Sequence, residues 1–142
     1  MLFRSPTPQQ VRAAIDNHFR FWNGGNRDAW IANFADDVVF HDPVGSPPKH
    51  GRAAAQRSWD NSFSNGQKWT LVLTQCVICG DEAAITLDNH GVVNGQAFTM
   101  RGIEVWKVDD AGRVCQVRAY FEPPPAVELD PYFRRRRDTA DE

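Results

Sequence analysis

The chain has 142 residues, of which 42% are hydrophobic and 24% charged, with a formal net charge of -2 at pH 7. This length fits one domain, which we expect over 1–142, with a core at about 7–123 and an extended tail at 124–142. The charge argues against binding to nucleic acid or to an anionic membrane. No apolar run approaches the ~18 residues that a membrane-spanning helix needs. The N-terminus lacks the apolar segment of a signal peptide, so we expect a cytoplasmic protein.

Three helices are predicted in the first half of the chain. Thr7 and Gln10 form a capping box that starts the first of them, and apolar residues then recur at helical spacing. The two acidic residues at 36–37 are expected to form a polar turn after the second helix. The expected helices cover 8–23, 26–34 and 52–63.

The second half of the chain alternates polar and apolar residues, which predicts long β-strands. Asn94 and Gly95 are a strong signal for a hairpin turn. Cys76 and Cys79 form a C-x-x-C motif, but they lie in a strand pattern instead of at a helix start, which favours a structural role over a redox or zinc site. The expected strands cover 69–79, 83–93, 97–108 and 113–122. The arginine run at 134–137 is expected to be a solvated part of the tail.

The segment from Val38 to Gly51 contains the first unusual polar residue. Val38, Phe40 and Asp42 point to one face of a strand, so Asp42 continues an apolar face, and Pro43 then ends the strand. Burying a carboxylate costs several kcal/mol, so such a residue usually has a role. The alternative is that Asp42 only caps the following turn.

Two more polar residues interrupt apolar faces. His18 lies in the middle of the apolar stripe of the first helix, where a histidine is more often a core residue than a catalyst. Glu104 is the only charge on a strand face that is otherwise apolar, although a bulge would return it to solvent. If Glu104 is buried without a partner, its pKa should rise, and the neutral acid would then be a hydrogen-bond donor.

The order of the elements and the residues DPVGSPPKHG resemble the ketosteroid isomerases of the nuclear transport factor 2-like superfamily. The resemblance extends over about 11–121 and is strongest over 34–52. It implies an α+β fold, a cone-shaped barrel in which a curved, mostly antiparallel sheet wraps around three N-terminal helices. The same fold carries dehydratases, epoxide hydrolases, cyclases and non-enzymatic binders, so it does not settle the reaction.

The resemblance also implies roles for individual residues. Asp42 falls at the position of the catalytic base, and Glu104 at that of a protonated aspartic acid in the oxyanion hole. His18 is a departure, because the isomerases carry a hydrogen-bonding tyrosine there. Phe121 matches an aromatic residue of the pocket, and Trp59 replaces a pocket tyrosine.

The leading hypothesis is an acid/base enzyme without cofactor or metal, of the isomerase, dehydratase, cyclase or epoxide hydrolase type. Its substrate would be a small apolar carbonyl or epoxide compound. Asp42 would take a proton or activate a water, while His18 and Glu104 would hydrogen-bond the oxygen that gains charge. The expected substrate-binding residues are Trp22, Trp59, Asn89, Trp106 and Phe121.

An alternative is a binding module without catalysis, in which Asp42 would pair with His18, and Glu104 with Asn89. A metal site made from one histidine and two carboxylates is a weaker hypothesis, because the family usually works without metal. The resemblance also implies a homodimer through the outer face of the sheet, where Ile103 and Val105 lie.

Overall fold

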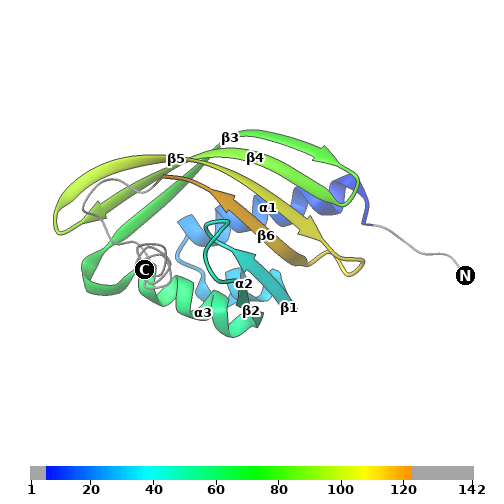
Figure 1. Cartoon of the computed structure of the whole chain (residues 1–142), viewed down its shortest axis with the longest axis horizontal. Helices are drawn as coiled ribbons and strands as arrows, with labels where there is room; N and C mark the ends of the chain where they lie inside the picture. Colours follow the sequence, from blue (N-terminus) through cyan, green and yellow to red (C-terminus); the bar gives the residue numbers. More distant parts are fainter. Residues whose placement is uncertain (1–5, 123–142) are drawn as a thin grey trace, which may run out of the picture.

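The computed structural model describes residues 6–122, so the expected tail and its arginine run lie outside the described residues. Two helices come first, two strands and a third helix follow, and four further strands complete the described part of the chain (Figure 1). The elements are α1 (Pro8–Asn23), α2 (Arg27–Ala32), β1 (Phe34–His41), β2 (Lys49–His50), α3 (Gly51–Ser62), a 3₁₀ turn (Ser64–Gly66), β3 (Lys68–Cys79), β4 (Glu82–Val93), β5 (Gln96–Val108) and β6 (Val114–Tyr120). No helix within 6–122 is long and apolar enough to cross a membrane.

The strands form one six-stranded sheet in the order β2-β1-β6-β5-β4-β3. All neighbours are antiparallel except β1 and β6, which are parallel. Figure 1 shows β3, β4 and β5 as a curved layer with the helices on its concave side. The α+β fold with a curved, mostly antiparallel sheet is therefore confirmed.

The boundary after α2 differs from the prediction. Phe34 begins β1 instead of ending the helix, because it is fully buried and pairs with Val114 of β6. Asp36 and Asp37 lie within β1, so the prediction of a polar turn was wrong. A register shift interrupts the β1–β6 ladder here, and both acidic side chains stay exposed, with Asp36 paired to Arg52 at 2.9 Å.

Two contacts fix α1 against the sheet. The Asn23 side chain donates to the carbonyl oxygen of Leu71 and accepts from its amide, at 2.7 and 2.9 Å. The Trp22 indole donates to the carbonyl oxygen of Trp69 on the same strand, at 3.0 Å. The last turn of α1 therefore packs against β3. Gly91 of β4 gives room to the Trp69 ring, because a Cβ there would lie 2.6 Å from an indole carbon.

Candidate functional site

Helix α1 presents His18 to the interior of the cone. Its side chain is 5% exposed and lies among aromatic rings, with 4.2 Å between its ring centroid and that of Trp106. The indole nitrogen Nε1 of Trp30 donates a hydrogen bond to His18 Nδ1 at 2.9 Å. Burial lowers the pKa of His18 to about 3, so the ring is neutral at physiological pH.

The second ring nitrogen of His18 has a different environment. Nε2 is buried and has no hydrogen-bond partner among the described residues. Unsatisfied buried polar groups cost roughly 1–3 kcal/mol and are rare in native proteins. Because His18 lines a cavity, a ligand that enters the cavity could bond to Nε2.

Strand β1 delivers Asp42 to the same cavity. Phe40 and Asp42 both line it, as the alternation in the sequence predicted, and the strand ends at His41. The peptide bond before Pro43 is cis. The Val44 amide then donates to the carbonyl oxygen of Ala119 on β6 at 2.9 Å, which ties the rim after Asp42 to the sheet.

Strand β5 places Glu104 on the interior face, and no bulge intervenes. Glu104 pairs with Ile85 on one side and Ala119 on the other, and the shift in the β5–β6 register comes only after Lys107. The indole nitrogen of Trp106 donates to Glu104 Oε1 at 3.0 Å.

Burial is the main reason why the pKa of Glu104 rises to about 8, and the nearby charge of Asp42 raises it further. The hydrogen bond from Trp106 acts in the opposite direction. Glu104 is therefore mostly protonated at neutral pH. A protonated carboxyl group that lines a cavity can donate a hydrogen bond to a ligand.

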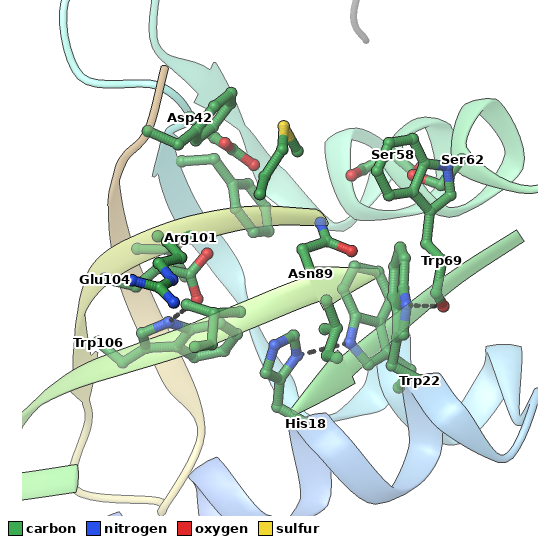
Figure 2. A pocket seen from close by; sticks show the side chains of 18 of the residues that line it. His18, Trp22, Asp42, Ser58, Ser62, Trp69, Asn89, Arg101, Glu104 and Trp106 are labelled. Carbon is green, nitrogen blue, oxygen red and sulfur yellow. Dashed lines mark hydrogen bonds between the residues drawn. The ribbon is translucent and has the colours of Figure 1, made fainter. Parts of the chain in front are cut away.

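His18, Asp42 and Glu104 thus line one cavity, and Figure 2 shows them on different walls of it. Most of the remaining lining is apolar. It consists of Trp22, Trp30, Phe34, Phe40, Ser58, Ser62, Trp69, Leu71, Leu87, Asn89, Met100, Arg101, Gly102, Trp106, Val117 and Phe121. Four of the five substrate-binding residues expected from the sequence are in this set.

Trp59 is the exception. It does not line the cavity but packs behind it, with ring centroids 5.1 Å from Trp22 and 5.5 Å from Trp30. That Trp59 contacts a substrate stays a prediction. In the structure its side chain is buried against the two indoles in front of it.

Sequence reasoning missed the polar contribution of α3. Ser58 and Ser62 line the cavity on the side of that helix (Figure 2), and the Ser62 hydroxyl donates to the carbonyl oxygen of Ser58 at 2.7 Å. Their four-residue spacing beside Trp59 was the available signal. Trp69 was also missed, although Trp69 and Leu71 are two residues apart on β3 and therefore both point inward.

Residues 15–134 match the SnoaL-like domain, which covers most of the chain. The chain belongs to the SnoaL-like family.

Several proteins resemble this SnoaL-like chain over nearly their full length. A steroid delta-isomerase of Nocardioides simplex is 26% identical over 118 residues, which are 83% of this chain and 94% of the relative. The crystal structure of a delta 5-3-ketosteroid isomerase from a Mycobacterium species is 28% identical, with a TM-score of 0.70 over 80% of this chain and 93% of that one. RV0760c from Mycobacterium tuberculosis, in complex with estradiol-17beta-hemisuccinate, is 25% identical, with a TM-score of 0.69 over 84% and 95% of the two chains.

The internal pairings of the binding-module alternative are not the ones found in this SnoaL-like structure. The Nδ1 atom of His18 accepts a hydrogen bond from Trp30, so this nitrogen does not pair with Asp42. Glu104 accepts a hydrogen bond from Trp106. The buried Oδ1 of Asn89 has no hydrogen-bond partner within the described residues. The buried nitrogen of His18 and the buried oxygen of Asn89 therefore stay available to a ligand.

The metal hypothesis finds no support in the described part of the chain either. Within 6–122, no three His, Cys, Asp or Glu side chains are grouped closely enough to hold a metal ion. Cys76 and Cys79 both lie on β3 as free thiols, in keeping with the strand pattern that the sequence predicted.

Proposed function

We propose that this SnoaL-like protein is an acid/base enzyme that isomerises an apolar, unsaturated ketone of steroid-like shape. One observation carries the proposal: a carboxylate, a protonated carboxyl group and a neutral imidazole line the same mostly apolar cavity. The likeness to two steroid isomerases supports the class of substrate.

In the proposed reaction, Asp42 removes a proton from the carbon between the carbonyl group and the double bond. The electron pair of that C–H bond moves into a dienolate, whose negative charge lies largely on the former carbonyl oxygen. The protonated Glu104 and the Nε2–H of His18 donate hydrogen bonds to that oxygen. The protonated Asp42 then returns the proton to the far end of the dienolate, and the double bond becomes conjugated.

General magnitudes give the expected contribution of each catalytic group to the rate. Proton transfer by a positioned group typically contributes about 10²–10⁴-fold to the rate. One oxyanion donor contributes roughly 10²–10³-fold. The aromatic lining strengthens these hydrogen bonds, because it keeps water away from the reacting oxygen.

The test is turnover of a delta-5-3-ketosteroid, followed by the ultraviolet absorbance of the conjugated product. The wild type should turn over, and Asp42→Asn should lose about 10²–10⁴-fold in kcat while it still binds estradiol-17beta-hemisuccinate. Full activity of Asp42→Asn would refute the mechanism. Binding without turnover, for a panel of enones and epoxides, would favour the alternative of a ligand-binding module.

We further propose a homodimer through the outer face of the sheet. Ile103 of β5 and Tyr120 of β6 are neighbours in register, with 54% and 43% of each exposed. Light scattering of the wild type and of Ile103→Lys would check this, with loss of the dimer expected in the variant. The cytoplasmic location expected from the sequence stays a prediction, to be checked by cell fractionation.

A further inference from the structure

The two nitrogen atoms of a neutral imidazole differ, since one carries the proton and the other a lone pair. An indole N–H can only donate a hydrogen bond. The Trp30 indole donates to His18 Nδ1 at 2.9 Å, so Nδ1 must present its lone pair. The ring is neutral, which leaves its one proton on Nε2.

We propose that Trp30 is a positioning residue that fixes His18 as its Nε2–H tautomer and so keeps a neutral N–H donor facing the cavity. This rests on the proposed function, in which that donor meets the oxygen of the dienolate. In the opposite tautomer, the Nδ1 proton would face the Trp30 N–H, and a lone pair on Nε2 would face the charged oxygen. Both contacts would be repulsive.

The aromatic residues around Trp30 hold its indole ring in place. Its indole is 4% exposed and packs edge-on against Trp22 and Phe34, at 5.0 and 4.8 Å between ring centroids. Trp59 lies behind it at 5.5 Å. The indole N–H therefore cannot turn away to another partner without disturbing several aromatic contacts.

None of the other groups around His18 changes the assignment of the ring proton to Nε2. Phe19 and Trp106, whose rings pack against it, carry no titratable group. The titratable residues that line the same cavity are Asp42, Glu104 and Arg101, and Arg101 is 92% exposed. None of them occupies His18 Nε2, which has no hydrogen-bond partner among the described residues.

The test is the nitrogen-15 NMR spectrum of the histidine rings in the ligand-free, uniformly labelled protein. The variant His18→Gln assigns the His18 signals among the four histidines of the chain. In the wild type we expect a protonated Nε2 and an unprotonated Nδ1, unchanged between pH 5 and pH 8. In Trp30→Phe, which removes only the N–H donor and part of the ring, we expect a mixture of the two tautomers.

Trp22→Phe is the matched control. Its indole also donates a buried hydrogen bond, but to the carbonyl oxygen of Trp69, at 3.0 Å. This variant loses a comparable contact and should leave the His18 tautomer intact. On an identified ketone substrate, Trp30→Phe should lower kcat more than it changes KM, because the affected bond strengthens as charge develops.

The NMR outcomes separate the two proposals. A protonated Nδ1 in the wild type, an imidazolium at neutral pH, or an unchanged tautomer in Trp30→Phe would each overturn the role of Trp30. If Trp30→Phe does not fold, the wild-type spectrum still decides which nitrogen carries the proton. If the expected tautomers are found but the protein turns over no substrate, Trp30 remains the residue that fixes His18. Only the isomerase function is then refuted.

Discussion

Asp42 and Glu104 line the same cavity, and the charge of Asp42 adds to burial in raising the pKa of Glu104 to about 8. Two carboxyl groups that interact in this way do not both ionise readily at neutral pH. In the proposed reaction, this arrangement divides the acid and base roles between them before a ligand arrives. Glu104 keeps its proton and donates a hydrogen bond, and Asp42 is the base.

The first prediction concerns stability and Glu104. The pKa of this group rises from 4.5 in the unfolded chain to about 8 in the fold, so the folded state binds more protons between these values. Its contribution to stability is fully present below pH 4.5 and is lost as the pH rises through 8. The free energy of unfolding changes by at most about 1.4 kcal/mol per pH unit, and partial exposure of Glu104 to solvent lowers this value. Glu104→Gln should flatten this decline in urea unfolding, and an identical slope in the variant would contradict the raised pKa.

The second prediction concerns His18 and has the opposite sign. The pKa of His18 falls from 6.5 in the unfolded chain to about 3 in the fold, so the unfolded state binds more protons between these values. The free energy of unfolding should decrease as the pH falls from 6.5 towards 3. His18→Gln, whose side-chain oxygen can still accept from Trp30, should lose that dependence. Urea unfolding of both proteins between pH 3 and pH 6.5 measures this, and the same pH dependence in the variant would contradict the lowered pKa of His18.

The third prediction concerns the far end of the cavity. Asn89 pairs with Met100 on β5, four residues along that strand from Glu104, or roughly 13 Å at the usual rise per residue. Its buried oxygen is without a hydrogen-bond partner among the described residues. We expect Asn89→Leu to weaken binding of a steroid with a hydroxyl group at that end by about 2–10-fold, the value of one net hydrogen bond.

The matched ligand for Asn89 is the same steroid without the far hydroxyl group. Its dissociation constant, measured by calorimetry, should be the same or lower in Asn89→Leu, because the apolar side chain leaves no unpaired oxygen. An equal loss of affinity for both steroids would mean that the substitution only distorts the cavity.

The fourth prediction concerns the wall made by Trp69. A Cβ on Gly91 would lie 2.6 Å from the Trp69 ring, whereas one on Gly102 would meet the flexible end of Leu87 at 3.4 Å. Gly91→Ala should cost about 1–3 kcal/mol of unfolding free energy through overpacking. Gly102→Ala, on the neighbouring strand, should cost clearly less. Similar losses in the two variants would refute this account of Gly91.

The sequence predicted on which face of a strand a residue lies better than how far it lies from the cavity. Alternation along β1 and β5 correctly pointed Asp42 and Glu104 inward, since a strand offers only two sides. It did not show that Trp59 lies behind the cavity, because depth depends on the bulk of the residues in front of it.

Long-range partners were the other missing element. His18 was singled out because it interrupts an apolar stripe, but its partner Trp30 lies on the next helix, across a turn. The angle between α1 and α2 brings the two side chains together, and no residue spacing within one helix encodes that angle. The end of α2 was misjudged for a related reason, because pairing with Val114 draws Phe34 into the sheet.

The crowding of indoles around the cavity has a practical consequence for identifying a ligand. The chain has five tryptophans; four line the cavity and the fifth, Trp59, packs directly behind it. The intrinsic fluorescence of the protein therefore originates almost entirely at this one place. A compound that enters the cavity should change the intensity or wavelength of that emission, so a chemical library can be screened optically, without any label and before a substrate has been found.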